Sequence, residues 1–260
     1  LLVDGSVVTW GDAKCGGDSS CVQDQLKDVK YLHSTHFAFA AMLPDRSVVT
    51  WGSRERGGDS TAVQEQLQNV TQVCATEAAF AALLGDDSVV TWGHAETGGD
   101  SSRIRDKLRN VTQVFATRYA FAALRGDASL VTWGPSLGAG DSSKVQRNLH
   151  NVQQVHSTEQ AFAALLADGS IVTWGHPEYG GDSSKVQSEL KAVKEVHASR
   201  RAFAALTSDG SVVTWGHAQG GGDSSAIQKQ LQGAKQIRAM ADGFTSVSGS
   251  GSILSWGTHL

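Results

Sequence analysis

The chain has 260 residues, a formal net charge of −4 and 18% charged side chains. This balance lacks the excess of positive charge typical of nucleic-acid-binding domains, so nucleic acid is not an expected partner. No segment approaches the roughly 20 consecutive apolar residues that a membrane-spanning helix needs. We therefore expect no membrane insertion.

A Thr-Trp-Gly or Ser-Trp-Gly triplet recurs through the whole chain at a constant spacing of 41 residues. Its tryptophans are Trp10, Trp51, Trp92, Trp133, Trp174, Trp215 and Trp256. A fixed period of this length indicates that one small structural unit is copied and stacked. Because stacked units share a continuous core, we predict a single repeat domain over residues 1–260, with a unit ending at each tryptophan.

Three short segments of each repeat are predicted strands, as at residues 71–75, 79–84 and 88–92. They are apolar and are bounded by Gly, Asp or Ser. The second segment is apolar on both faces, so both faces should be covered. Asp-Gly-Ser links the second and third segments in several repeats, which predicts a tight hairpin whose glycine adopts a positive φ.

A fourth element precedes the first strand of each repeat. Val22, Leu26 and Val29 have helical spacing, and Asp18 or Ser19 would be the N-cap. This pattern favours a short outer helix or helical turn, although an outer strand is the alternative. Such units bury two apolar faces only by stacking, most simply as radial blades, with an open solenoid as the alternative.

The repeat resembles that of the regulator of chromosome condensation (RCC1-like) family. The similarity lies in Val-x-x-Val-x-Ala-Thr, Ala-Phe-Ala-Ala-Leu and Asp-Gly-Ser-Val-Val-Thr-Trp-Gly, followed by four residues and Gly-Gly. It covers essentially the whole chain. The resemblance implies an all-β fold, a β-propeller of about seven blades, six being the alternative, with an incomplete first blade.

The chain departs from that family at two points. Gly-Asp-Ser-Ser stands where the family has Gly-Gln-Leu-Gly, and all units have the same length. The founding member uses a protruding wedge to exchange nucleotide on a small GTPase, and uniform units leave no room for one. Residue 1 also falls within a unit, so we expect the chain to be a fragment that lacks N-terminal residues.

The repeated polar residues are explained by the fold. The aspartates at position 18 and its equivalents come one to a unit, whereas calcium needs six to eight converging oxygens. Capping or a hydrogen bond to loop amides explains them better. The position of His33, His156 and His197 also accepts Phe115 and Arg238, which argues against a designed metal site. We predict no catalytic residues, cofactor or metal, and no enzyme.

The three cysteines, Cys15, Cys21 and Cys74, are too few for a disulfide framework. They favour a reducing intracellular compartment, with a local Cys15–Cys21 disulfide as the alternative. The tryptophans could stack on glycans as in lectins. Each lies in an apolar strand beside glycine, however, so packing between blades is the favoured interpretation.

Two positions in each repeat vary, and both should lie at the same end of the strands. One is the four-residue span after Trp-Gly, and the other is the pair before the second strand. Surface loops on a rigid scaffold are common binding sites. The candidate partner-binding residues are Arg54, Arg56, His94, Glu96, Arg118, Tyr119, His176, Glu178, Tyr179, Arg200 and Arg201.

The sequence thus predicts a non-enzymatic scaffold or complex subunit that binds a protein partner through these variable loops. Three alternatives stay open. They are a nucleotide exchange factor for a small GTPase, a substrate-recruiting module of a ubiquitin ligase, and a lectin-like binder.

Overall fold

The computed structural model describes residues 1–257, and within them six repeats each form one three-stranded antiparallel sheet. The first strands are β1 (Tyr31–Ser34), β4 (Val70–Ala75), β7 (Val111–Ala116), β10 (Val152–Ser157), β13 (Val193–Ala198) and β16 (Ala234–Met240). The second strands are β2 (Ala38–Met42), β5 (Ala79–Leu84), β8 (Phe121–Arg125), β11 (Ala161–Leu166), β14 (Ala202–Thr207) and β17 (Gly243–Ser248). The third strands are β3 (Val48–Gly52), β6 (Val89–Gly93), β9 (Leu130–Trp133), β12 (Ile171–Gly175), β15 (Val212–Gly216) and β18 (Ile253–Gly257).

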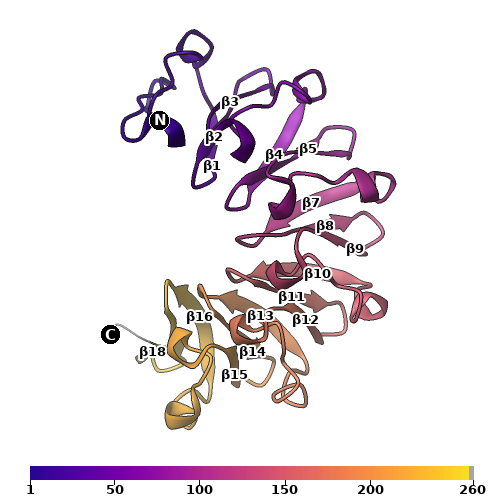
Figure 1. Ribbon diagram of the computed structural model, residues 1–260. Helices are drawn as coiled ribbons and strands as arrows, with labels where there is room; N and C mark the ends of the chain where they lie inside the picture. Colours follow the sequence, from indigo (N-terminus) through magenta and orange to yellow (C-terminus); the bar gives the residue numbers. More distant parts are fainter. Residues whose placement is uncertain (258–260) are drawn as a thin grey trace. The chain divides into compact units, whose positions relative to one another are not determined.

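The chain divides into two compact units, which are described separately. Unit 1 comprises Leu1–Gly126 and Val131–Pro135, and unit 2 comprises Asp127–Leu130 and Ser136–Leu260. In Figure 1 the sheets of each unit follow one another in chain order. Whether residues 1–260 behave as a single domain stays a prediction. In residues 1–257, no helix has the length and apolar character needed to cross a membrane.

The predicted strands are confirmed to within a residue at their ends. In the second repeat, β4, β5 and β6 correspond to the predicted segments at residues 71–75, 79–84 and 88–92. Alternate residues of β5 point to opposite faces, and Phe80, Ala81 and Ala82 are all fully buried. Both faces of the second strand are therefore covered by neighbouring elements, as its apolar composition predicts.

The tryptophans join each repeat to the one before it. Trp92 stacks on Phe80 with 5.2 Å between ring centroids, and its Nε1 donates at 3.1 Å to the carbonyl of Gly57, which lies in the loop after the third strand of the preceding sheet. A Cβ on Gly57 would lie 2.6 Å from the Phe80 ring, so glycine fits here without displacing the ring, whereas Ala139 holds the equivalent position in a later repeat. The same indole bond forms at Trp51, Trp92, Trp133, Trp174, Trp215 and Trp256, each at most 5% exposed. Packing between repeats is thus confirmed for six tryptophans.

The outer element is a pair of 3₁₀ helices around the Gly-Gly-Asp-Ser loop, which confirms the favoured helical interpretation. After the third strands come η3 (Arg54–Arg56), η5 (Ala95–Thr97), η7 (Ser136–Gly138), η9 (Pro177–Tyr179) and η10 (Ala218–Gly220), and η1 (Ala13–Cys15) holds the same repeat position after Trp10. Before the first strands come η2 (Gln23–Gln25), η4 (Gln64–Gln66), η6 (Ser102–Lys107), η8 (Gln146–Asn148) and η11 (Ser225–Ile227).

The repeated aspartate tightens the loop and does not cap a helix. Asp18 accepts the backbone N–H of Ser20 at 2.9 Å, and the equivalent aspartates bond in the same way. The N-cap predicted at Asp18 or Ser19 is wrong, because η2 begins later and Val22 precedes it. The hydrogen bond to a loop amide is the interpretation that the structure supports.

The hairpins between the second and third strands each turn through a residue in the left-handed region, directly before the serine that precedes the third strand. Asp168 accepts the backbone N–H of Ser170 at 2.9 Å, and Gly169 has φ 77°. Three other repeats have a different residue at the position of this glycine, with a similar positive φ: Arg46, Asp87 and Ala128. The expected positive φ of the glycine is confirmed.

The first repeat, which ends at Trp10, differs from the prediction. Residues 6–10 were expected to form a third strand, but they pair with no strand among residues 1–257. A strand exists only through such pairing. Trp10 consequently lacks a stacking phenylalanine and is 83% exposed. The packing predicted for the tryptophans is therefore wrong at Trp10.

Candidate protein-interaction face

Hydroxyl side chains tie the two variable loops of a repeat together. Thr76, which begins the loop between the first and second strands, donates from its Oγ1 to the carbonyl of Thr97 in η5 at 2.9 Å. The equivalent hydroxyls are Thr35, Thr158 and Ser199, which donate to the carbonyls of Arg56, Tyr179 and Gly220. Both variable loops thus lie at the same end of the sheet. We call this end, formed by the loops at residues 36–37, 53–56 and their equivalents, the variable-loop face.

Backbone hydrogen bonds align these loops between neighbouring repeats. In unit 1, His36 N–H donates to the Glu77 carbonyl at 3.0 Å, and Glu77 N–H donates to the Arg118 carbonyl. In unit 2, Glu159 N–H and Arg200 N–H make the same bonds to the next repeat, at 2.9 Å each. Side chains at one repeat position are therefore held at a regular spacing along each unit.

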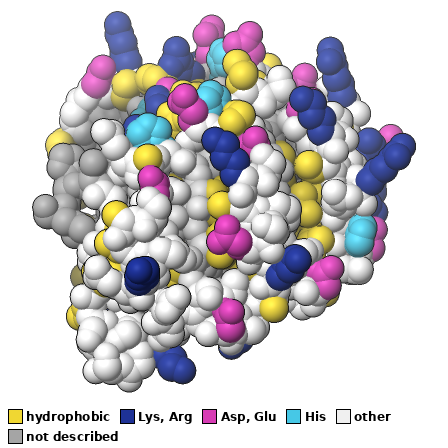
Figure 2. Space-filling view, turned by 90° about the horizontal axis from the view of Figure 1, so that it is seen from below, with side chains coloured by type: hydrophobic (Ala, Val, Ile, Leu, Met, Phe, Trp, Pro, Cys, Tyr) yellow, Lys and Arg dark blue, Asp and Glu magenta, His cyan; other side chains and the backbone are white. Residues whose placement is uncertain are grey.

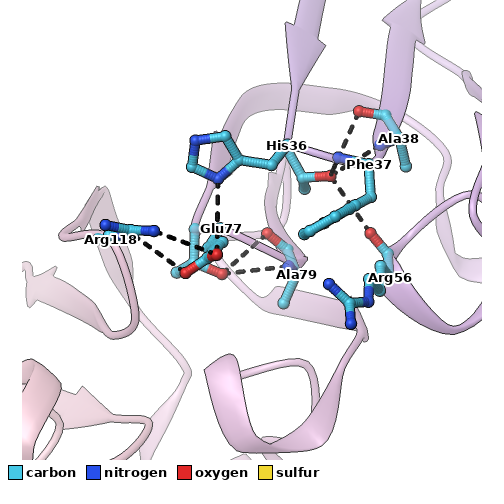
Figure 3. Close-up of polar contacts among 9 residues, drawn as sticks. His36, Phe37, Ala38, Arg56, Glu77, Ala79 and Arg118 are labelled. Atoms are coloured by element: carbon cyan, nitrogen blue, oxygen red, sulfur yellow. Dashed lines mark hydrogen bonds and ion pairs between the residues drawn. The ribbon is translucent and has the colours of Figure 1, made fainter. Parts of the chain in front are cut away.

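Glu77 is the centre of a polar cluster in unit 1 (Figure 3). Its carboxylate accepts from Nε of Arg118 at 3.0 Å and from Nη2 at 3.3 Å, and it lies 3.9 Å from Nδ1 of His36. The hydrogen bond from Arg118 is the largest cause that lowers the pKa of Glu77. Two repeats are joined by this charge-assisted, bidentate contact.

Arg56 lies beside this cluster and stacks on an aromatic ring. Its Cζ sits 4.0 Å from the centroid of the Phe37 ring, and both side chains are drawn in Figure 3. A guanidinium that stacks on an aromatic ring is pre-organised and keeps its N–H groups available. Arg54, two residues earlier, instead donates to Asp59 at 2.6 Å. Bonds from Thr61 and then Arg54 lower the pKa of Asp59 to about 2.

Three predicted residues from two repeats line one groove in unit 1. They are His94, Glu96 and Tyr119, and the groove has a volume of about 900 Å³. Ile104 and Pro135 also line it. Tyr119 is half-buried and lies 5.1 Å from the Arg118 guanidinium. The groove combines apolar residues with polar and charged ones, which is the composition of many peptide- and protein-binding sites.

The other five predicted residues lie in unit 2. The rings of His176 and Tyr179 meet edge to face at 5.3 Å, and Glu178 is exposed between them in η9. Nη1 of Arg200 and Nη2 of Arg201 both lie near Asp242, at 3.8 and 4.0 Å. The sequence did not single out Asp242. Charged side chains of both signs are intermixed on the surface seen in Figure 2.

The first strands carry titratable side chains of another kind. Burial lowers the pKa of His156 to about 4, with a smaller contribution from His197 on the next strand. Burial raises the pKa of the Cys74 thiol to about 11, and this thiol contacts the Val114 carbonyl at 3.1 Å. Both groups are therefore uncharged at neutral pH. No group of three or more His, Cys, Asp or Glu side chains in residues 1–257 could hold a metal ion.

All three cysteines are free, so the alternative of a Cys15–Cys21 disulfide is wrong.

The sequence also contains a pattern that predicts the ion pairs and that the sequence analysis missed. One repeat position reads Glu77, Arg118, Glu159 and Arg200, with alternating sign. Because the backbone places that position side by side in neighbouring repeats, alternation predicts pairing, as it does at Glu77 and Arg118.

No protein-family model matches the chain, and no curated protein matches its sequence. Solved structures do. Prp20p of Saccharomyces cerevisiae is 16% identical with a TM-score of 0.52, over 92% of this chain and 74% of that one. Yeast RCC1 (Prp20) bound to Kap60 gives 15% and 0.52, over 92% and 72%. The ectodomain of the Physcomitrella patens receptor kinase CR4 gives 15% and 0.50, over 88% and 62%.

The fold is an RCC1-like β-propeller fold. Six three-stranded sheets in residues 1–257 agree with blades of this type, and about seven blades is consistent with the repeats. At 15–16% identity the likeness concerns the fold alone. The RCC1-like repeat is thus confirmed at the level of architecture.

Proposed function

We propose that the protein is a non-enzymatic scaffold that binds a protein partner through the variable-loop face. The observation that carries this proposal is the bond from Thr76, Thr158 and their equivalents to the loop that follows the third strand. It fixes two loops of varied sequence at one end of each sheet. Rigidly held loops with Arg, Tyr and His side chains suit protein recognition.

Charged and aromatic groups on this face support the proposal further. Arg56 is exposed, is stacked on Phe37 and has no carboxylate partner among residues 1–257, while His94, Glu96 and Tyr119 share a groove. The similar protein Prp20p is described with binding properties to Gsp1p and histones. A binding role for a protein partner is therefore consistent with the architecture, and the partner itself is part of the proposal.

The test is quantitative affinity capture from an extract of cells that express the protein. The double variant E96A/Y119A changes the groove, and R200E/R201E reverses the charge on the same face of unit 2. The control K30A/K191A alters exposed residues away from both variable loops. We expect both face variants to lose proteins that the wild type and the control retain. Equal recovery by all four proteins would contradict the proposal.

Nucleotide exchange on a small GTPase is the second candidate, because Prp20p is described with binding properties to Gsp1p. The η3, η5 and η9 loops have three residues each, so no wedge protrudes from them. Accelerated nucleotide release from a panel of small GTPases would support exchange. A ubiquitin-ligase module would instead bring a ligase into the captured set. A lectin role would need exposed tryptophans to stack on glycans, but six of the indoles are buried, and Trp92, for example, is 5% exposed.

A further inference from the structure

A glutamine side chain covers the outer edge of the sheet in five repeats. In the second repeat, Gln64 Nε2 donates to the Val48 carbonyl at 2.9 Å, and Gln64 Oε1 accepts from the Ser60 hydroxyl at 2.7 Å. The carbonyl belongs to the third strand and points away from its sheet. The same bond to the equivalent carbonyl forms from Gln23, Gln146, Gln187 and Gln228. It satisfies an edge acceptor that would otherwise be open to another chain.

The third repeat lacks this cover. Arg105 occupies the position of the glutamine, and its Nη2 lies 3.4 Å from Oε1 of Gln66 in the preceding repeat. No described side chain donates to the carbonyl of Val89, which is the counterpart of the Val48 carbonyl. Thr91 and Ser101 keep their hydroxyl contact at 2.9 Å, as in the other repeats. The hydroxyl contact between the third strand and the outer loop is therefore preserved, and only the side-chain hydrogen bond to the edge carbonyl is missing.

A second change occurs in the same segment. Residues 102–109 contain Arg103, Arg105, Lys107 and Arg109 against a single acidic residue, Asp106. The equivalent segments of the other five repeats have at most two lysines or arginines. All four cations are exposed. The chain as a whole has a net charge of −4, so this concentration of positive charge is local to one outer segment.

Val89 and two of the four cations line the same groove in unit 1, which has a volume of about 490 Å³. Leu84, Val89 and Leu108 form its apolar part, and Arg105 and Arg109 line its wall. Asp86 also lines it, and its carboxylate accepts the Ser88 N–H and hydroxyl, while the charge of Arg109 makes a smaller contribution to its lowered pKa. An open backbone acceptor, two guanidinium groups and apolar surface therefore face one space.

We propose that this groove binds an acidic, extended peptide segment of a partner protein. A backbone N–H of the peptide would donate to the Val89 carbonyl and so extend the edge of the β4–β6 sheet, as in recognition by strand addition. Glutamate or aspartate side chains of the peptide would accept from Arg105 and Arg109, whose planar donors match carboxylates. Apolar side chains that alternate with the acidic ones would contact Leu84 and Leu108.

The uncovered carbonyl favours a peptide backbone over a phosphate backbone. Phosphate groups accept hydrogen bonds and could use the arginines, but they offer no donor to Val89. A peptide backbone supplies a donor at every second residue of one edge. This docking site lies on the outer edge and is separate from the variable-loop face, so its test does not depend on the function proposed above.

The experiment measures fluorescence polarisation with a labelled peptide of alternating glutamate and valine, Val-Glu-Val-Glu-Val-Glu. The key variant is R105Q, which introduces the glutamine present in the other five repeats and should restore the cover of Val89. The matched control is R103Q, which removes the same charge from the same segment but lies outside the groove. Two further probes are the N-methylated peptide, which lacks backbone donors, and a single-stranded oligonucleotide of ten deoxythymidines. Thermal melting establishes that both variants are folded.

We expect R105Q to weaken peptide binding at least about tenfold and R103Q to weaken it less than about threefold, because general attraction changes little with one exposed charge. The N-methylated peptide should bind at least about tenfold more weakly than the unmodified one. Four outcomes would overturn the proposal. They are no peptide binding up to about 1 mM, equal loss in the two variants, binding that ignores N-methylation, and tighter binding of the oligonucleotide.

Discussion

At the scale of single residues, the repeat depends on a glycine that touches two aromatic rings of the next repeat. Gly98 has φ 91°, and a Cβ there would lie 2.7 Å from the Phe121 ring and 3.4 Å from Trp133. Its carbonyl also accepts from Nε1 of Trp133 at 3.0 Å. Backbone conformation and packing thus disfavour a Cβ at Gly98, although the equivalent position of the next repeat is Ala139, which has φ 74° and accepts the same indole bond from Trp174.

We therefore predict that Gly98→Ala lowers the free energy of unfolding by roughly 2–4 kcal/mol, from left-handed strain and overpacking together. Gly233→Ala is the matched control. Gly233 has φ 73°, but a Cβ there would meet nothing within 4 Å, so only about 1 kcal/mol of backbone strain is expected. Urea denaturation measures both. Similar losses in the two variants would show that contact with the Phe121 ring has no energetic weight.

His156 gives the protein a stability that depends on pH. Burial lowers its pKa to about 4 from the usual 6.5. Above pH 6.5 the imidazole is neutral in both states and has no effect. As the pH falls from 6.5 to 4, the unfolded chain takes up the proton and the folded one does not, so the folded state loses stability.

Between pH 7 and pH 5 we expect this loss to be about 2 kcal/mol from His156. His33, whose pKa burial also lowers, adds to it in the same direction. The variant His156→Gln removes the titrating group and should shrink the difference between the two pH values by the share of His156. Urea denaturation at both pH values checks this. A difference unchanged in the variant would mean that other groups cause the pH dependence.

At the scale of the element, the outer 3₁₀ segment is fixed to its sheet by one glutamine. Gln64 bonds both Ser60 and the Val48 carbonyl. Gln64→Ala should cost about 1–2 kcal/mol, because two hydrogen bonds are lost and a half-buried carbonyl loses its donor. Gln68→Ala, at an exposed position nearby, should change stability by less than about 0.5 kcal/mol. If the two variants melted at the same temperature, the hydrogen bonds of Gln64 would make no measurable contribution to stability.

Much of each element could be predicted because its signals are local. The strand pattern around Phe80, the turn at Gly169 and the helical spacing of Val22 and Leu26 all lie within a few residues of one another. The missed features join positions about one repeat apart. Trp92 and Gly57 are 35 residues apart, and Arg118 and Glu77 are 41 apart. Spacing shows that such positions recur, but not that they touch.

The candidate face was predictable for the same reason, and only to the same extent. Variation between repeats located the loops that contain Arg56, His94 and Tyr119. It did not show that Arg54 and Arg118 already have carboxylate partners, or that Arg56 stacks on Phe37. These contacts depend on how the backbone turns between strands. Sequence therefore identified the face, whereas the structure distinguishes paired cations from available ones.

At the scale of the whole molecule, the chain divides into two compact units. Stability in repeat proteins is approximately a sum of terms for each repeat and for its neighbours, so damage at one repeat need not reach distant ones. A strongly destabilising change in unit 1 should therefore leave the exchange of unit 2 amides nearly unaltered. Gly98→Ala is such a change, because Gly98 and its contacts Phe121 and Trp133 all belong to unit 1.

Hydrogen–deuterium exchange with mass spectrometry tests this directly. Amides of β4–β8 should exchange faster in Gly98→Ala by a factor that reflects the lost stability, about tenfold for each 1.4 kcal/mol. Peptides from β13–β17 should exchange at the wild-type rate. The reciprocal variant is Gly180→Ala, whose Cβ would meet the Phe203 ring at 2.5 Å in unit 2. It should accelerate exchange in β13–β17 and spare β4–β6. Uniform acceleration through all repeats in either variant would show that the chain unfolds as one cooperative body, and would exclude independent opening of the two units.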